Sequence, residues 1–384
     1  MGGPVKDPPP ATAADWREKA RRFASERVEP IAARIDREDR VPDELVRALA
    51  EERFLGLGIP PEWDGMGGDT RSVVAVLEEL SRSSAAIGVL IAVHLSVCAL
   101  PILTRGTDLQ RERYLRPLAR GERVGAFGLT EPGAGSDTAR LRTRYSRTDD
   151  GFTLEGTKMF ISNGASAGVV LLFATSDPAL GHRGISAFIV PPGTSGFSVG
   201  QRFEKLGLRG SETVELVLHD VHLPPDSLLG PEGEGLRIAL GALQGGRVGI
   251  ASCALGVAEA AFAEMRRSVA ARDDADWKRT ALARAFADLA SARALVARAA
   301  EAKDLGAPYE TEASVAKLVA ARAAVEIASA GVDVAGDAGP SGRAVAERLL
   351  RDARVFPIVE GTTEIQELIL ARSLLSPSAG RNPL

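Results

Sequence analysis

The sequence predicts a mostly α-helical chain of the α+β class, in which one β domain separates two helical domains. The first observation is a change of hydrophobic periodicity along the 384 residues. The pattern is helical at both ends of the chain, whereas short runs rich in β-branched residues occupy the middle. The second observation is composition, because 45% hydrophobic and 26% charged residues are typical of a globular protein with a substantial core. At about 150 residues per domain, this length corresponds to two or three structural units.

The N-terminal helical domain is predicted over residues 15–121, after a tail of residues 1–14. Leu45, Ala48 and Leu49 mark one apolar face at helical spacing, and Pro42-Asp43 is typical of a helix start. Residues 83–104 contain no Asp, Glu, Lys or Arg, and this uncharged stretch is long enough for a membrane span. Because this stretch stands alone and contains Ser, His and Pro, we favour a buried helix over membrane insertion.

The middle β domain is predicted over residues 122–231. Runs rich in β-branched residues and Phe occur at 168–175 and 186–190, separated by Gly, Pro, Asn and Asp. In residues 213–219, the apolar Val214, Leu216 and Leu218 alternate with polar residues. This alternation indicates a half-buried strand.

The C-terminal helical bundle is predicted over residues 232–376, followed by a tail of residues 377–384. Helical periodicity returns after the Gly-Pro-Glu-Gly sequence of residues 230–233, as the spacing of Val315, Leu318 and Val319 illustrates. Alanine is abundant here, which favours both helix formation and close packing between helices.

The charge balance argues against several classes of protein. Forty-seven basic and 51 acidic residues give a net charge of -4, with a sequence pI near 5.8. This balance provides no field for binding nucleic acid or an anionic membrane. The two cysteines, Cys98 and Cys253, lie far apart, which excludes a disulfide framework and a cysteine-based zinc site. Targeting and lipidation signals are not recognisable, so we expect a cytoplasmic protein.

Common catalytic and nucleotide-binding motifs do not identify a function for this sequence. Neither a Gly-x-Gly-x-x-Gly after a strand nor a Walker-type loop occurs. Residues 164–168 match the Gly-x-Ser-x-Gly of serine hydrolases around Ser166. They join two strand-like runs rather than a strand and a helix, which favours a hairpin loop. His219 and His222 offer metal ligands in principle, but a solvated strand edge is the favoured interpretation.

Residues 126–138 carry a stronger signal. An apolar strand runs into a turn of small residues, where backbone N–H groups lie beside the hydroxyl groups of Thr130 and Ser136. Glycine lets such a loop approach a flat, polar-edged ligand closely. A plain hairpin corner is the alternative.

Residues 354–365 form the second distinctive segment. Glu360 follows an apolar run and precedes Gly361, an arrangement that desolvates a carboxylate while leaving it sterically open. Desolvation raises the pKa of a carboxyl group and makes it a stronger base. The alternative is that Glu360 caps the following helix.

Five segments in this order resemble the acyl-CoA dehydrogenase flavoprotein family. They are residues 126–138, 155–164, 205–213, 243–251 and 354–365. The resemblance covers residues 15–375. It implies a helical domain, a β-barrel domain and a four-helix bundle, which matches the three regions predicted above.

The resemblance also implies FAD as cofactor, bound between the β domain and the C-terminal bundle. Loop residues line the edge of the flavin, an aromatic residue covers one face, and a hydroxyl lies near its N5 atom. Two further residues lie near the phosphates and the adenosine, and one basic residue contacts the pyrophosphate of a neighbouring subunit. The edge of the flavin is matched by Phe127, Leu129, Thr130, Gly135 and Ser136, its face by Phe160 with Ile161, and the hydroxyl near N5 by Ser162. The positions near the phosphates and the adenosine are Thr362 and Glu364, and the basic residue is Arg272.

For the substrate, the resemblance implies an acyl thioester whose α-proton is removed by Glu360 while the β-hydride passes to the flavin. The positions implied on the substrate side are Ser136, Gln244, Arg247, Leu90, His94, Val359 and Gly361. Gln244 stands where the family usually has Asp. His94 either favours a polar or short acyl group or is a core histidine with local hydrogen bonds.

Several properties remain open at this stage. The thioester carrier is coenzyme A or an acyl-carrier protein, and the electron acceptor is an electron-transfer flavoprotein or, in an oxidase, oxygen. A homodimer or homotetramer is expected. A non-enzymatic, DNA-associated relative is the alternative class, which the net charge disfavours.

Two segments depart from the family pattern. Residues 271–280 look shortened and acidic where the family contacts the FAD pyrophosphate of a neighbouring subunit, and only Arg272 is a possible substitute. In residues 336–339, Asp337 lies where the family has a glycine-rich turn near the adenosine. Both departures predict weaker or differently held FAD.

Overall fold

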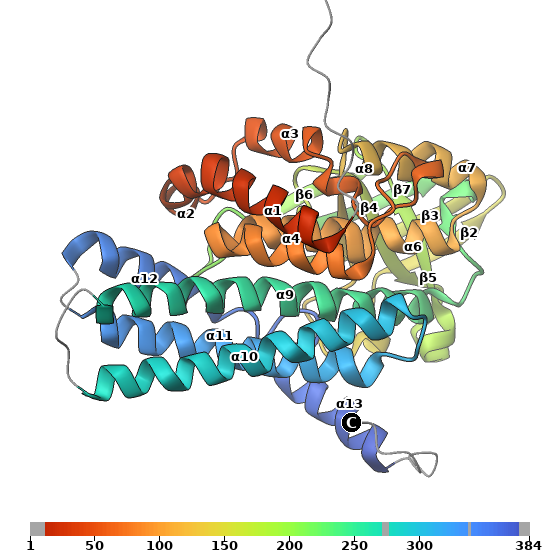
Figure 1. Cartoon of the computed structure of the whole chain (residues 1–384). Coiled ribbons are helices and arrows are strands. Elements are labelled where there is room, and N and C mark those ends of the chain that lie inside the picture. Colours follow the sequence, from red (N-terminus) through yellow and green to blue (C-terminus); the bar gives the residue numbers. More distant parts are fainter. Residues whose placement is uncertain (1–11, 271–275, 337–338, 376–384) are drawn as a thin grey trace, which may run out of the picture.

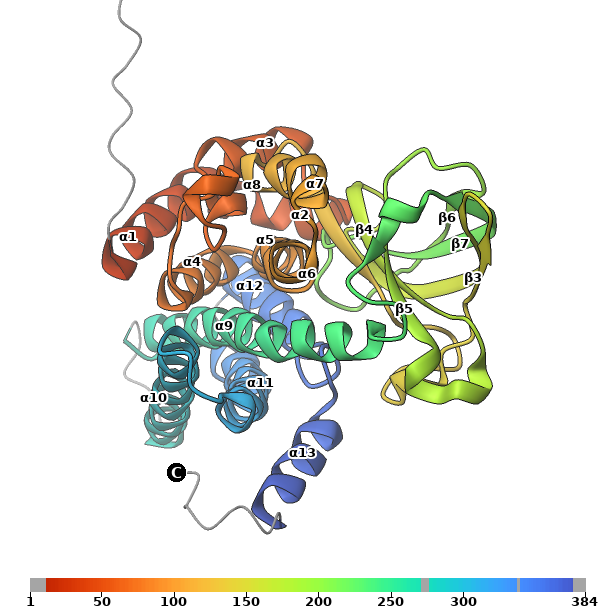
Figure 2. The ribbon, with the colours of Figure 1, turned by 90° about the vertical axis from the view of Figure 1, so that its right-hand side faces the viewer.

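The computed structural model describes residues 12–270, 276–336 and 339–375. It confirms the order of a helical region, a sheet and a second helical region (Figure 1). Figure 2 shows the strands to one side of the two helical layers. The predicted tails lie outside the described residues, except for residues 12–14.

The N-terminal domain begins two residues earlier than predicted. Helix α1 starts at Ala13 because Thr12 and Asp15 form a capping box, in which each side chain accepts a hydrogen bond from the other residue's backbone N–H. The helical elements are α1 (Ala13–Phe23), η1 (Ala24–Val28), η2 (Glu29–Ile31), α2 (Ala32–Glu38), α3 (Asp43–Glu51), η3 (Phe54–Gly56), η4 (Pro61–Trp63), α4 (Thr70–Ser83), α5 (Ala85–Ala92), η5 (Val93–Ala99), α6 (Leu100–Arg105), α7 (Asp108–Gln110), η6 (Arg111–Leu115) and α8 (Arg116–Arg120).

The uncharged stretch is a core helix. Two helical stretches of the described chain, Ala85–Arg105 and Gly235–Ala270, are long and apolar enough to cross a membrane by length and composition alone. However, 89% of the most apolar part of the first stretch and 78% of that of the second are buried inside the protein. Because the protein itself covers their apolar surface, both act as core helices.

The middle domain is one eight-stranded sheet with its own apolar core. The strands are β1 (Val124–Gly128), β2 (Arg144–Thr148), β3 (Gly151–Ser162), β4 (Ala167–Thr175), β5 (Ile185–Val190), β6 (Phe197–Arg202), β7 (Thr213–Leu223) and β8 (Leu228–Leu229), with the 3-10 turns η7 (Thr138–Arg140), η8 (Pro178–Gly184) and η9 (Pro225–Ser227) between them. The strand order is β6-β7-β3-β2-β4-β5-β8, and β1 pairs with β4. The Val214, Leu216 and Leu218 side chains of β7 are buried, as their alternation predicts.

The structure corrects the hairpin interpretation of residues 164–168. They do connect two strands, but β3 and β4 do not pair, because β2 lies between them. The Ser166 hydroxyl donates a hydrogen bond to Glu212. His219 instead contacts Glu155, and His222 contacts Thr153 and Asp220, so no histidine activates this serine.

The C-terminal bundle consists of α9 (Gly235–Ala270), α10 (Asp276–Asp304), α11 (Glu310–Ala335) and α12 (Gly339–Ala353). Helices α9, α10 and α11 run side by side in both views (Figures 1 and 2). Their buried faces are dominated by alanine and glycine, which let the helix backbones approach closely. Helix α13 (Thr363–Leu375) extends away from the bundle, and the segment that joins it to α12 carries Glu360.

Candidate active site

Glu360 is held in an unusual backbone conformation between two helices. Its φ is +52°, in the left-handed region, and the next residue, Gly361, has φ +95°. A non-glycine residue in this region is held there by its surroundings, and such positions are common at functional sites. Phe356, fully buried four residues earlier, anchors the segment. Glu360 does not start α13; Thr362 accepts a hydrogen bond from the Ile365 N–H at that helix start.

One oxygen of the Glu360 carboxyl group is buried without a hydrogen-bond partner, although the residue as a whole is half-buried. Its Oε2 atom is shielded from solvent and finds no donor among the described residues. The space it occupies exists because residue 246 of α9 is glycine: a β-carbon there would overlap Oε2, well inside van der Waals contact. Gly246 belongs to the segment of residues 243–251, but its role depends on a contact with a residue 114 positions later in the sequence.

Burial raises the pKa of Glu360 to about 8, although the charges of Lys317 and Arg247 act in the opposite direction. Lys317, on α11, is fully buried, and burial lowers its own pKa to about 8. Its Nζ atom donates a hydrogen bond of 2.7 Å to the Gly361 carbonyl oxygen. A cation therefore holds the backbone beside Glu360 and moderates the basicity of its carboxyl group.

Lys317 was not predicted from the sequence. The available signal is a lysine among alanine, valine and leucine on a helix, which more often marks the edge of an apolar face than a buried cation. Arg247 was predicted and is buried on α9, where its Nη1 atom lies 3.4 Å from the Ser314 hydroxyl. Its Nε atom has no hydrogen-bond partner among the described residues, and burial lowers its pKa.

A second group of residues forms around the loop after β1. Lys158 of β3 and Glu131 of the loop make a fully buried ion pair of 2.6 Å. Glu131 also accepts backbone N–H groups of Arg142 and Thr143, while Lys158 donates to the Leu129 carbonyl. Burial alone would raise the pKa of Glu131, but the Lys158 ammonium and these donors hold it below its usual value. The ion pair therefore fastens the loop to the strand.

This ion pair leads to a stability prediction. We expect Lys158→Met to lower the free energy of unfolding by about 3 to 5 kcal/mol, because it leaves the Glu131 carboxylate buried without a cation. Urea denaturation followed by circular dichroism measures this loss. The double variant Lys158→Met/Glu131→Leu should recover most of it, since an apolar pair can replace a buried ion pair. A single variant as stable as the wild type would show that the pair does not hold the loop.

The loop and β3 present the residues expected at a flavin. Backbone hydrogen bonds join them, because the Met159 N–H donates to the Thr130 carbonyl. Phe160 has a φ of +58°, in the left-handed region. The residue leaves 57% of its surface exposed to water, which is unfavourable for a large apolar ring. Its ring lies 4.7 Å from that of Phe203. An exposed aromatic ring suits contact with the face of a flat cofactor.

The other predicted flavin residues lie on β1, on the loop that follows it and on β3. Phe127 lies on β1, Leu129 and Thr130 follow that strand, Ile161 and Ser162 end β3, and Gly135 and Ser136 lie exposed in the loop. A β-carbon at Gly135 would meet nothing within 4 Å, so this part of the loop borders open space. The donor set and the open loop therefore fit FAD.

His94 is a core residue in this fold. Both His94 ring nitrogens are satisfied by backbone: Nδ1 accepts from the Gly125 N–H at 3.0 Å, and Nε2 donates to the Leu55 carbonyl at 2.9 Å. Burial lowers the pKa of His94 to about 4, so the ring is neutral. Of the two interpretations, the structure shows the core histidine. The Leu90 carbonyl accepts a hydrogen bond from Asn163, which ties α5 to the turn after β3.

The remaining predicted site residues make few contacts that bear on their expected roles. Gln244 is half-buried on α9, Val359 precedes Glu360, and Glu364 is exposed in the first turn of α13. A hydrogen bond with Thr362 lowers the pKa of Glu364, so a carboxylate occupies this helix start. Arg272 and Asp337 lie outside the described residues. No group of three His, Cys, Asp or Glu side chains in the described ranges is placed to hold a metal ion.

Family models match the chain in three consecutive parts. The acyl-CoA dehydrogenase N-terminal domain matches residues 10–122, the middle domain residues 126–221 and the C-terminal domain residues 233–375. The chain belongs to the acyl-CoA dehydrogenase family. It is therefore an oxidoreductase of the class that acts on CH–CH groups, and FAD is the cofactor of this family.

Individual acyl-CoA dehydrogenases are similar over nearly their whole length. The short-chain specific acyl-CoA dehydrogenase of Clostridium acetobutylicum is 41% identical over 362 residues, which is 92% of this chain and 96% of that protein. The structure of butyryl-CoA dehydrogenase from Megasphaera elsdenii superposes with a TM-score of 0.93 at 35% identity, covering 98% of this chain and 100% of that one. A glutaryl-CoA dehydrogenase of Mycobacterium smegmatis in complex with FADH2 has a TM-score of 0.89 at 29% identity, with 96% of each chain covered.

Proposed function

We propose that this protein catalyses the FAD-dependent α,β-dehydrogenation of a short-chain acyl-CoA, with Glu360 as the base that removes the α-proton. The observation that carries this proposal is the Glu360 carboxyl group, whose Oε2 atom is buried and unpartnered and whose pKa burial raises to about 8. A structural carboxylate would be paired, because an unpaired buried charge is costly. The names of the relatives support a short acyl group.

The reaction needs a strong base because the α-proton of a thioester is only weakly acidic. Removal from water raises the basicity of Glu360, and the thioester carbonyl needs a hydrogen-bond donor as its enolate develops. The backbone N–H of Glu360 donates to no acceptor among the described residues, so it is available for that carbonyl. Lys317 holds the adjoining Gly361 carbonyl and so keeps this N–H in position. When bound, FAD accepts the hydride that leaves the β-carbon.

The raised pKa predicts a specific pH dependence. Because the ionised carboxylate is the active form, kcat/KM should rise about tenfold per pH unit below pH 7 and level off above a pKa near 8. Lys317→Met should move this limb to higher pH, since the Lys317 charge lowers the pKa of Glu360. Steady-state rates with butyryl-CoA between pH 6 and 9.5 measure both effects. A limb near pH 4.5, the value of an ordinary glutamate, would contradict a buried base.

Anaerobic bleaching of the flavin band tests the proposed substrate. We expect butyryl-CoA to bleach the band faster than longer acyl-CoA thioesters or an acyl group on a carrier protein. Fast bleaching by the carrier-bound group alone would assign an acyl-carrier-protein substrate instead. Absence of bleaching by any thioester would leave the non-enzymatic alternative.

The electron acceptor is proposed to be an electron-transferring flavoprotein rather than oxygen. Reoxidation of the bleached protein by each acceptor, followed in a stopped-flow instrument, distinguishes a dehydrogenase from an oxidase. We also propose a homo-oligomer located in the cytoplasm. Sedimentation of the purified protein decides between a monomer, a dimer and a tetramer.

A further inference from the structure

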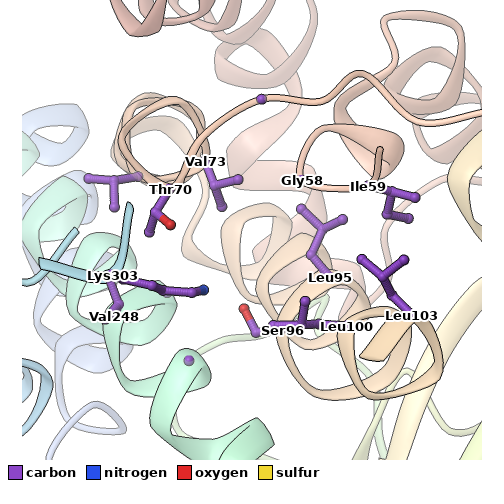
Figure 3. A pocket seen from close by; sticks show the side chains of 14 residues that line it. Gly58, Ile59, Thr70, Val73, Leu95, Ser96, Leu100, Leu103, Val248 and Lys303 are labelled. Atoms are coloured by element: carbon purple, nitrogen blue, oxygen red, sulfur yellow. The ribbon is translucent and has the colours of Figure 1, made fainter. Parts of the chain in front are cut away.

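A small pocket lies where α4, the α5–η5–α6 stretch, α9 and the end of α10 meet (Figure 3). Its volume is about 70 Å³, and neither Glu360 nor the loop after β1 borders it. One water molecule occupies roughly 10 to 15 Å³ of such a volume, so the pocket has room for a ligand of about six non-hydrogen atoms. It therefore does not border the candidate base, and it is large enough for a small molecule.

One side of the pocket carries polar groups without protein partners. The Lys303 ammonium and the Ser96 hydroxyl both point into the same space (Figure 3). Within the described ranges, Lys303 forms no ion pair or hydrogen bond, and its Nζ atom lies 6.0 Å from the centre of the Tyr309 ring. Ser96 is 8% exposed and makes no hydrogen bond within the same ranges. Burial lowers the pKa of Lys303, although the charge of Asp304 acts in the opposite direction.

The nearest acid, Asp304, makes no ion pair with Lys303 and is engaged elsewhere. Asp304 follows it in sequence, but its carboxylate accepts the backbone N–H groups of Thr70 and Arg71 and pairs with the Arg71 side chain at 3.5 Å. It therefore serves as a cap for the start of α4. A cation and a free hydroxyl remain directed into the pocket.

The rest of the lining is mostly apolar. Val73, Leu95, Leu100 and Leu103 contribute this apolar lining, Thr70 adds a further hydroxyl, and two glycines of α9, Gly245 and Gly249, border the pocket (Figure 3). Gly245 lies directly beside the ammonium, because a β-carbon there would be in van der Waals contact with Lys303 Nζ at 3.5 Å. The pocket thus combines one cationic end with an aliphatic wall.

We infer that this pocket binds a short aliphatic carboxylate, with its anionic end on Lys303 and Ser96 and its chain against the leucines. One ammonium and one hydroxyl match the single charge of a carboxylate, whereas a dianionic phosphate needs more donors. Two molecules can supply this carboxylate. One is a free short-chain acid, and the other is an acyl group that carries a carboxylate at its far end. The second source rests on the proposed function.

The site is also connected to the candidate base through α9. Gly245 and Gly249 border the pocket, while the intervening Gly246 borders the Glu360 carboxyl group and Arg247 acts on its charge. A ligand that shifts this short stretch of helix therefore changes the surroundings of Glu360.

Calorimetric titration of the FAD-loaded protein with sodium butyrate tests the site. We expect saturable millimolar binding that Lys303→Met weakens by at least about tenfold, since it removes a charged hydrogen-bond donor. Lys303→Arg should retain most of the affinity, and Ser96→Ala should weaken it moderately. Butan-1-ol, which has the same chain without a charge, should bind more weakly. Absence of saturable butyrate binding, or binding unaffected by Lys303→Met, would overturn the inference.

A kinetic arm separates the two sources. If the pocket receives the end of the acyl group, Lys303→Met raises KM for glutaryl-CoA and leaves that for pentanoyl-CoA unchanged. If both KM values stay unchanged while butyrate binding is lost, the ligand is a free acid. Because calorimetry requires no turnover, failure of the proposed function and failure of this site are distinguishable.

Discussion

Glu360→Gln should lower kcat with butyryl-CoA by about 10⁴-fold, the upper end of what a positioned general base contributes. Glutamine has nearly the same shape but cannot accept the α-proton, so the loss falls on chemistry rather than on binding. FAD content and KM should remain close to the wild-type values. Stopped-flow bleaching of the flavin under nitrogen measures the rate of the chemical step.

Two companion measurements make this test specific. Glu367→Gln, an exposed glutamate on α13, is the matched control and should retain wild-type kcat. Exchange of the substrate α-proton with deuterated water should disappear in Glu360→Gln and persist in the control. Near wild-type turnover by Glu360→Gln would show that another group removes the proton.

Gly246→Ala should lower kcat/KM by about 100-fold, because misplacing a catalytic group by about 1 Å has an effect of this size. A β-carbon at position 246 overlaps the Glu360 carboxylate, which lies at the end of a flexible side chain and can turn aside. The fold should therefore persist while the base leaves its position. Measuring kcat/KM together with the thermal midpoint separates these two effects.

Gly241→Ala provides the control for helix propensity. It lies on the same helix, where a β-carbon would meet nothing within 4 Å. Alanine should therefore stabilise the protein by about 0.5 to 1 kcal/mol and leave kcat/KM unchanged. Equal activities for the Gly246→Ala and Gly241→Ala variants would show that Gly246 does not make room for the carboxylate.

The three-part fold was predictable because it depends on patterns local to the chain. Helical periodicity around Leu45 and Val315, and the strand alternation of Val214, Leu216 and Leu218, appear in the structure where they were expected. The connection around Ser166 was misjudged because pairing between strands depends on a distant segment: β2 is inserted between β3 and β4. Local alternation identifies a strand but not its neighbours.

The candidate site was predictable in part for the same reason. Glu360 could be singled out from the apolar run before it and the glycine after it. Gly246, Lys317 and the Lys158–Glu131 pair could not, because each acts on a residue far away in sequence. The partner of a charged or small residue is decided by packing, and a single sequence records only its type.

By itself, the sequence determined the order of the domains, the family and the acid that serves as the candidate base, since each follows from residues close together in the chain. Only the tertiary structure decided that His94 is a neutral core residue, that Gly246 makes room for the Glu360 carboxyl group, and that Lys303 faces an apolar pocket. The physical reason is that burial and electrostatic interactions depend on distances in space. Helices that are distant in the chain set those distances when they pack.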